Sequence, residues 1–151
     1  MRLVLSLTFL LGTSYGQGDG VEWSGIFAIP TTTTSLTWRM QQVGGRYAKP
    51  SMKMVVLPTK NCTLANLDTL QETGWPAHQM STTCPAQKAG ATIKPSFNGC
   101  FNLTADSAAR SSNFQIDVTG IPCIAVFTDH DPEYFQNDRH YLDAERIADE
   151  L

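Results

Sequence analysis

The sequence predicts a mainly β fold, an antiparallel β-sandwich with one or two short helices, stabilised by disulfides. Three observations support this prediction. Short runs rich in aliphatic, β-branched and aromatic residues are separated by glycine and proline along most of the chain. Helical periodicity is confined to short stretches. The cysteines are even in number, which favours two cross-links in an oxidising compartment.

Residues 1–16 have the features of a signal peptide. Arg2 gives a positive start, residues 3–11 are apolar, and the small residues Ser14 and Gly16 precede the expected cleavage site. The apolar run is shorter than the roughly 20 residues that a membrane-spanning helix needs. We therefore expect a single secreted β-rich domain, residues 17–151, with no membrane span.

Three strands are expected in the first part of this domain. The first covers residues 21–29 and the second covers residues 36–43, which end at the turn signal Gly44-Gly45. A third run begins at Arg46, breaks at Pro50 and continues to residue 57. The order predicts a three-stranded β-meander, and the proline break predicts an edge strand or a bulge.

A short helix should follow, because leucines recur at every third position from Leu64 to Leu70. Thr63 or Asn61 provides an N-cap, and Gly74 provides a stop. Residues 74–90 contain two prolines without a hydrophobic period, which predicts a loop. Three further strands are predicted at residues 97–103, 114–118 and 123–127.

A second short helix is predicted at Asp131-Pro132-Glu133, where an acceptor cap, a first-turn proline and an acid come together. This helix would carry Tyr134 and Phe135 inward.

Four cysteines allow three disulfide connectivities, and sequence alone does not choose among them. We favour Cys84–Cys100, because residues 94–99 form a turn signal before Cys100, which leaves Cys62–Cys123 for the longer loop. A zinc site is disfavoured because the chain has no C-x-x-C pair.

Two N-glycosylation sequons begin at Asn61 and Asn102. In a secreted chain both asparagines are expected to carry sugar and to lie at the surface.

Charge is distributed unevenly along the chain. Residues 17–128 carry six acids and eight bases, whereas residues 129–151 carry eight acids and two arginines, a net charge of −6. No basic stripe of the kind that binds nucleic acid is present. The acidic C-terminal segment 129–151 instead indicates cations or a basic partner surface as ligands.

Carboxylates and imidazoles in this segment are candidate ligands for Ca²⁺ or another divalent cation. The candidates are Asp129, His130, Asp131, Glu133 and His140. The spacing does not fit an EF-hand, because Tyr134 and His140 replace its glycine and final glutamate. A three-histidine site that adds His78 is conceivable. The alternative is an ordinary helix cap followed by a solvated acidic end with no metal.

No catalytic motif is visible, since the chain lacks G-x-S-x-G and its cysteines are expected to be oxidised. A competing function is a small-molecule or carbohydrate-binding sandwich with a pocket lined by Trp23, Trp38 and Trp75, which could include an activity without a visible motif. The first two tryptophans lie in predicted strands, where aromatic residues usually fill a core.

The last four residues, Ala148-Asp149-Glu150-Leu151, match K-D-E-L retrieval signals at three of four positions. Retention in the lumen of the endoplasmic reticulum is therefore an alternative to secretion.

Three stretches resemble a mollusc family that comprises extrapallial fluid protein, heavy-metal-binding histidine-rich glycoprotein and albumen gland protein. They are WSGIF at residues 23–27, VGGRYAKPSMKMVVLP at residues 43–58, and FTDHDPEYF at residues 127–135 with HYL at residues 140–142. The middle stretch is the most specific. The resemblance covers residues 21–143.

This resemblance implies a secreted glycoprotein that binds Ca²⁺ and other divalent cations and self-associates as a homo-oligomer. The segment around His130 matches a histidine-containing segment of the family, which assigns it to metal. One departure concerns the mature N-terminus, where the metal-rich members have a dense histidine tract and this chain has only QGDG at residues 17–20. High-capacity heavy-metal binding is therefore not expected.

Overall fold

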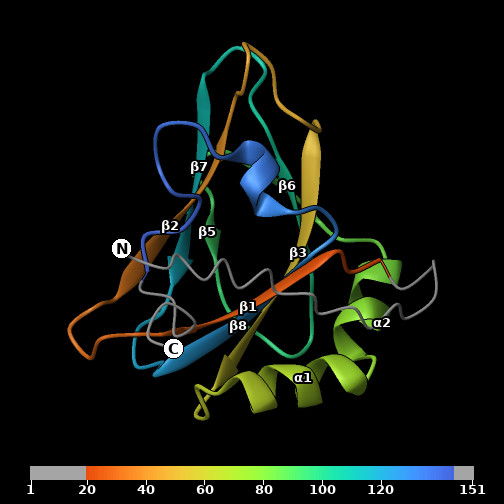
Figure 1. Ribbon diagram of the computed structural model, residues 1–151, viewed down its shortest axis with the longest axis vertical. Helices are drawn as coiled ribbons and strands as arrows, with labels where there is room; N and C mark the ends of the chain where they lie inside the picture. Colours follow the sequence, from red (N-terminus) through yellow and green to blue (C-terminus); the bar gives the residue numbers. More distant parts are fainter. Residues whose placement is uncertain (1–19, 145–151) are drawn as a thin grey trace, which may run out of the picture.

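Two β-sheets form the framework of the protein in a computed structural model that describes residues 20–144. The strands are β1 (Trp23–Ala28), β2 (Ser35–Gln41), β3 (Ser51–Thr59), β4 (Ala86–Lys88), β5 (Thr92–Ile93), β6 (Phe101–Thr104), β7 (Ser111–Asp117) and β8 (Cys123–Thr128). One sheet has the order β1-β8-β3-β6-β4, and the other has the order β2-β7-β5 (Figure 1). The predicted mainly β, disulfide-stabilised sandwich is confirmed.

The predicted meander is wrong, because the first three strands are not neighbours. β1 pairs with β8, whereas β2 belongs to the other sheet and pairs with β7. Gly44 and Gly45 do form the predicted turn, with φ values of 63° and 81° that favour glycine, but the chain then crosses to the other sheet. Most strand pairs are antiparallel, whereas β4–β6 and β5–β7 are parallel.

β3 lies inside the five-stranded sheet, which corrects the prediction of an edge strand or a bulge. The strand begins at Ser51, directly after Pro50, so that this proline does not interrupt the ladder. β3 pairs with β6 through Ser51–Met54 and with β8 through Met54–Thr59. Pro58 therefore lies beyond the part of β3 that pairs with β6. Because proline has no N–H to donate, its position there removes no hydrogen bond between β3 and β6.

Both faces of the five-stranded sheet are buried, and β3 shows how. Met52, Met54 and Val56 belong to the cluster between the two sheets, whereas Val55 and Leu57 belong to a second cluster on the opposite face. Alternate side chains of a strand point to opposite faces, so a strand buried on both sides has a continuous apolar sequence.

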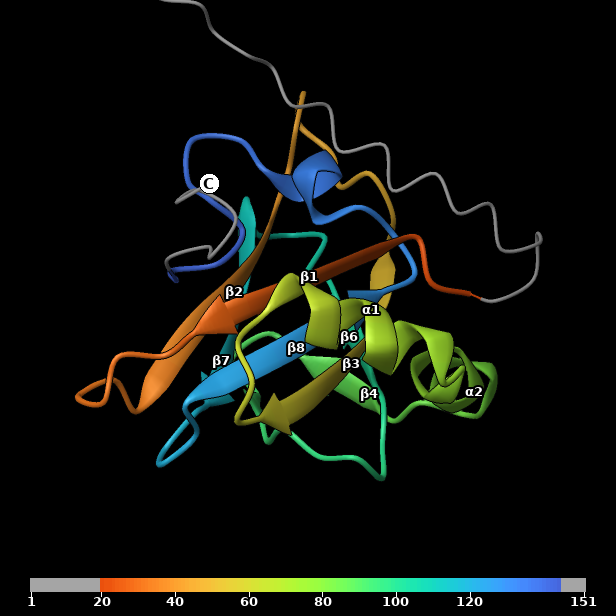
Figure 2. The same cartoon turned by 60° about the horizontal axis from the view of Figure 1, so that its bottom comes forward.

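Two helices cover that opposite face, α1 (Leu64–Glu72) and α2 (Trp75–Ser81) (Figure 2). α1 is the predicted helix, with the Thr63 side chain accepting a hydrogen bond from the Asn66 N–H. The prediction of a loop over residues 74–90 is wrong where α2 forms. A glycine at its N-cap and Pro76 in its first turn are compatible with a helix start, and burial of Pro76 and Met80 stabilises this short helix through tertiary packing.

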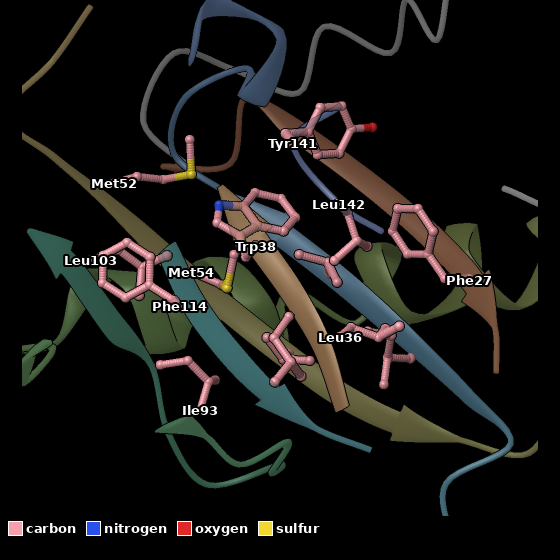
Figure 3. Packing of buried hydrophobic residues seen from close by; sticks show 14 of the residues in the cluster. Phe27, Leu36, Trp38, Met52, Met54, Ile93, Leu103, Phe114, Tyr141 and Leu142 are labelled. Atoms are coloured by element: carbon pink, nitrogen blue, oxygen red, sulfur yellow. The ribbon is translucent and has the colours of Figure 1, made fainter. Parts of the chain in front are cut away.

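The core between the sheets contains large aromatic and sulfur-containing side chains (Figure 3). Trp38, Phe114, Met54 and Phe27 are completely buried there. The predicted disulfides are both present, with Cα–Cα distances of 5.6 Å for Cys62–Cys123 and 5.1 Å for Cys84–Cys100. The second disulfide lies in the cluster beneath the helices.

Residues 129–144 form a packed segment, which we call the C-terminal strap. It leaves β8, passes through the 3-10 helix η1 (Pro132–Phe135) and reaches the free edge of β2 (Figure 1). There the Arg39 N–H donates to the Tyr141 carbonyl oxygen at 2.7 Å, and Trp38 and Leu142 form an antiparallel bridge. β2 is thus flanked by β7 on one edge and by the strap on the other.

The strap is anchored by its apolar residues, while its acids Glu133, Asp138 and Asp143 are exposed, as the solvated alternative expects. Phe135, Tyr141 and Leu142 are almost completely buried. Asp131 caps η1 as predicted, but only one of the two aromatic residues expected to point inward does so, because Tyr134 is 60% exposed. The signal peptide and the terminal Ala148–Leu151 lie outside the described residues.

Candidate functional site

The five predicted metal ligands occupy different parts of the strap. Asp131 caps η1, and Glu133 is exposed on it. His140 packs against Tyr141, with Nδ1 3.1 Å from the Leu142 carbonyl oxygen. Asp129 and His130 lie at the other end of the strap, where they meet Glu22, which precedes β1.

Glu22 joins the cluster because β1 pairs with β8. Its N–H donates to the Thr128 carbonyl oxygen at 2.9 Å, which aligns the start of one strand with the end of the other. His130 Nδ1 lies 3.6 Å from Glu22 Oε2, and His130 Nε2 lies 3.9 Å from Asp129 Oδ2. Each ring nitrogen therefore faces a different carboxylate.

Sequence reasoning missed Glu22 because only the β1–β8 register brings it to His130. Among residues 20–144, no three histidine, cysteine, aspartate or glutamate side chains form a group that could hold a metal ion as they stand. The third histidine, His78, lies on α2 beside Trp75 and does not complete a three-histidine site within this part of the chain.

Asp129 has a structural role in addition to any ligand role. Its carboxylate accepts a hydrogen bond from the Lys53 N–H at 2.8 Å, and its own N–H donates to the Lys53 carbonyl oxygen at 3.2 Å. Burial raises the pKa of the Asp129 carboxyl above its ordinary value, although the Lys53 N–H acts in the opposite direction.

The three tryptophans do not line a common pocket. Trp38 is completely buried, and its ring centroid lies 6.2 Å from that of Trp23 and 5.3 Å from that of Tyr141. Trp75 lies on α2 and is 37% exposed. The prediction of a tryptophan-lined pocket is therefore wrong. Trp23 and Trp38 fill the core instead, as aromatic residues in strands usually do.

A polar groove of about 580 Å³ lies instead over the outer face of the three-stranded sheet. Its floor comes from side chains of β2 and β7 that point away from the core, including the cross-strand pairs Arg39–Asn113 and Gln41–Ser111. The residues that line it are Arg39, Gln41, Gln42, Gly44, Gly45, Arg110, Ser111, Asn113, Asn137, Asp138 and Arg139.

Gln41 fixes one wall of the groove. This buried side chain accepts hydrogen bonds through Oε1 from the N–H groups of Asn137 and Arg139, at 3.0 and 3.3 Å. Its amide nitrogen donates to the Asp138 carboxylate. Every polar atom of the amide thus contacts residues 137–139, which holds this part of the strap beside β2.

Arginines dominate the charge of the groove. Arg39 is paired with Asp143 through two contacts, at 2.7 Å to Oδ1 and 2.5 Å to Oδ2, and this pairing lowers the pKa of the Asp143 carboxyl. Arg110 and Arg139 are exposed, and their guanidinium groups form no ion pair with any residue between 20 and 144.

The two sequons lie in different environments. Asn61 is exposed, and its Oδ1 accepts a hydrogen bond from the Thr63 hydroxyl at 2.8 Å. Asn102 is half-buried within β6, between β3 and β4, and its Oδ1 is buried without a hydrogen-bond partner in the described protein. Glycosylation at both remains a prediction, and the geometry favours the first sequon.

Comparison with known proteins yields no matching family model, curated protein or solved structure. Within residues 20–144, no helix has the length and apolar character needed to cross a membrane.

Proposed function

We propose that this chain is an extracellular binding protein whose ligand is a small, polar, hydrogen-bonding molecule held in the groove over β2 and β7. The observation that carries this proposal is the lining of the groove, in which side chains from β2, β7 and the strap converge on one volume of about 580 Å³. Two disulfides are compatible with the oxidising compartments of the secretory route.

The chemistry of the lining sets the kind of ligand. Guanidinium, amide and hydroxyl groups surround the volume, and no aromatic or aliphatic side chain is among the described residues that line it. Such groups exchange hydrogen bonds with hydroxyls and charged oxygens, whereas an apolar ligand would leave them unpaired. The proposal therefore favours the carbohydrate-binding alternative, without the tryptophan pocket expected for it.

A groove-filling substitution tests this function. Asn113 is exposed on the groove floor, so Asn113→Trp should fill the groove without disturbing the core. Ser35→Trp is the matched control, because Ser35 is exposed on the same sheet but does not line the groove.

Saturation-transfer NMR would be recorded with separate neutral, carboxylated and sulfated mono- and disaccharides. We expect at least one class to give a signal that Asn113→Trp abolishes and Ser35→Trp preserves. A signal that survives Asn113→Trp, or no signal from any class, contradicts the proposal.

Divalent-cation binding is a second candidate function, as the family resemblance implies. The observation in its favour is the convergence of Glu22 with Asp129 and His130, two of the five predicted ligands. A cation would require the His130 ring or the carboxylates to move, because the two ring nitrogens face different carboxylates.

Calorimetric titration of the metal-free protein with Ca²⁺ and with Zn²⁺ tests this candidate. Glu22→Gln should reduce saturable heat, whereas the same charge change at the exposed Glu72 of α1 should leave it intact. Heat that is equal in both variants places the cation elsewhere. The absence of heat with either metal removes cation binding.

Secretion and retention remain proposals that a cell experiment separates. An epitope tag would be inserted after residue 16, so that the terminal Ala148–Leu151 remains free. Protein in the medium supports secretion, whereas intracellular protein that is released when Leu151 is deleted supports retention.

A further inference from the structure

We propose that the groove recognises an acidic saccharide, with Arg110 and Arg139 binding its sulfate or carboxylate group. This inference rests on the proposed function and specifies the ligand class. It begins from the contrast among the three arginines that line the groove. Asp143 satisfies Arg39 through two contacts, which leaves Arg110 and Arg139 as the cationic groups open to a ligand.

The two open arginines come from opposite sides of β2. Arg110 directly precedes β7, and its carbonyl oxygen accepts a hydrogen bond from the Gln42 N–H at 2.9 Å. Arg139 belongs to the strap, and its N–H donates to Gln41 Oε1 at 3.3 Å. Both backbones are therefore anchored at the end of β2, to its last residue Gln41 and to Gln42 directly after it, while both side chains are exposed to solvent.

A guanidinium group is suited to this task because its planar set of N–H donors matches the oxygens of a carboxylate or a sulfate. Fixing the backbone of each arginine lowers the conformational cost of binding. The chain carries a net charge of −3, so the arginine-rich groove is a local departure from the sign of the whole protein.

The remaining residues that line the groove indicate the chemistry of the rest of the ligand. Asn113, Ser111 and Gln42 line the same groove with neutral hydrogen-bonding groups, and the Ser111 hydroxyl already donates to Asn113 Oδ1 at 2.9 Å. Amide and hydroxyl groups of this kind suit the hydroxyls of a sugar. The turn at Gly44 and Gly45 adds no side chain to its end of the groove. No aromatic ring lines the volume within the described residues, which disfavours a nucleotide base.

Asp138 distinguishes this groove from a binding site for a free inorganic anion. Its carboxylate accepts a hydrogen bond from Gln41 and also lines the groove. A carboxylate repels a free polyanion but accepts hydrogen bonds from sugar hydroxyls. The combination therefore fits a ligand with one anionic group and several hydroxyls better than it fits an inorganic anion.

The test compares an Arg110→Gln/Arg139→Gln double variant with Arg46→Gln. Arg46 is exposed in the adjacent turn but does not line the groove, so it controls for the loss of positive charge. Calorimetric titrations would use a sulfated disaccharide, a galacturonic acid disaccharide, a neutral disaccharide and sodium sulfate. Thermal melting would verify that each variant is folded.

We expect at least one acidic disaccharide to bind, and its affinity to fall at least about tenfold in the double variant, which corresponds to the loss of a charge-assisted hydrogen bond. Arg46→Gln should retain the affinity. The relative response to the sulfated and the galacturonic acid disaccharide would identify the acidic group.

Other outcomes separate the two proposals. Equal binding of the neutral disaccharide, unchanged in the double variant, overturns the arginine assignment but preserves the groove as a saccharide site. Sodium sulfate binding as tightly as the disaccharides identifies a free-anion site and overturns the saccharide. No binding of any probe overturns both.

Discussion

The indole of Trp23 lies over Gly25, its neighbour two residues along the same face of β1. A Cβ atom built at Gly25 would lie 2.5 Å from Trp23 Cη2 and 3.2 Å from Phe27 Cε2. The indole has little freedom to withdraw, because it packs against Trp38 and Tyr141. Gly25 is therefore a packing requirement of the core, at a position where no positive φ explains glycine.

Gly25→Ala should lower the free energy of unfolding by about 1–3 kcal/mol, the usual cost of overpacking. Chemical denaturation measures this change. Gly99→Ala is the matched control, because a Cβ there meets no atom within 4 Å and its φ is not positive. Equal stability of the two variants would show that the Trp23 ring can move aside.

Asp129→Asn should stabilise the protein at pH 7. The asparagine oxygen still accepts the Lys53 N–H, while the cost of burying a charge disappears. Because the folded-state pKa of Asp129 is raised, the unfolded state loses its proton first as pH increases. The stability of the wild type relative to the variant therefore decreases as the pH rises above about 3.9, the ordinary pKa of an aspartate carboxyl.

Thermal melts at pH 3 and pH 7 measure this difference in stability. The two proteins should melt together at pH 3, and the variant should melt higher at pH 7. Asp68→Asn on the exposed face of α1 controls for the change in net charge. A variant that melts lower at pH 7 would indicate that the ionised Asp129 carboxylate is stabilising.

The two disulfides should contribute unequally to stability. Cys62–Cys123 closes a sequence separation of 61 residues and Cys84–Cys100 one of 16, so chain entropy predicts contributions of about 4 and about 3 kcal/mol. Denaturant unfolding of the two double-alanine variants, each with the other disulfide intact, measures the difference. A larger loss from Cys84→Ala/Cys100→Ala would contradict the ordering.

Gln41→Ala should loosen the strap locally while the sheets remain folded. The N–H groups of Asn137 and Arg139 would lose their shared acceptor, whereas the Arg39 N–H keeps its bond to the Tyr141 carbonyl oxygen. Amide hydrogen exchange at Asn137 and Arg139 should accelerate about tenfold, the equivalent of one hydrogen bond, without a change at Arg39. Gln42→Ala, which removes a groove amide that does not hold the strap, should leave all three rates unchanged.

Enzymatic deglycosylation of protein secreted by eukaryotic cells should detect sugar on Asn61 and none on Asn102. The first is exposed, whereas the second lies in an interior strand with its side-chain oxygen buried. Asn61→Gln should therefore remove the mass shift on enzyme treatment, and Thr104→Val should not. A shift that persists in Asn61→Gln would show that the β6 sequon is modified before the strand pairs.

Local patterns predicted the elements that local physics determines. The cap of α1, the Gly44-Gly45 turn and the start of η1 follow from residues close in sequence, and the turn signal before Cys100 favoured, among three possible pairings, the one that the structure contains. Strand neighbours did not follow, because a meander and a sandwich with β1 beside β8 share the same local pattern. The apolar run in β3 is typical of a strand buried on both faces, yet the break at Pro50 led to the wrong prediction of an edge strand or a bulge, and the helices under β3 explain its burial.

The sites show the same division. The acidic residues after β8 were predicted as ligands from their local sequence. Glu22 was not, because it reaches His130 only through pairing between strands about a hundred residues apart in sequence. Individual arginines and amides at Arg39, Gln41, Arg110 and Arg139 carry no motif, and only the β2–β7 register and the strap assemble them into a groove. A site built from ordinary polar residues on one sheet face leaves no spacing to detect.

The position of the strap after β8 also constrains how the protein is made. β1 lacks its partner until β8 has been synthesised, and β2 keeps an open edge until residues 141–143 arrive. An emerging chain therefore exposes unpaired strands until this segment has been synthesised, and neither sheet edge can be completed before then. A premature stop before Asn137 would remove the buried Tyr141 and Leu142 together with one wall of the groove, so a shortened product should be cleared by quality control instead of surviving as a partial binder.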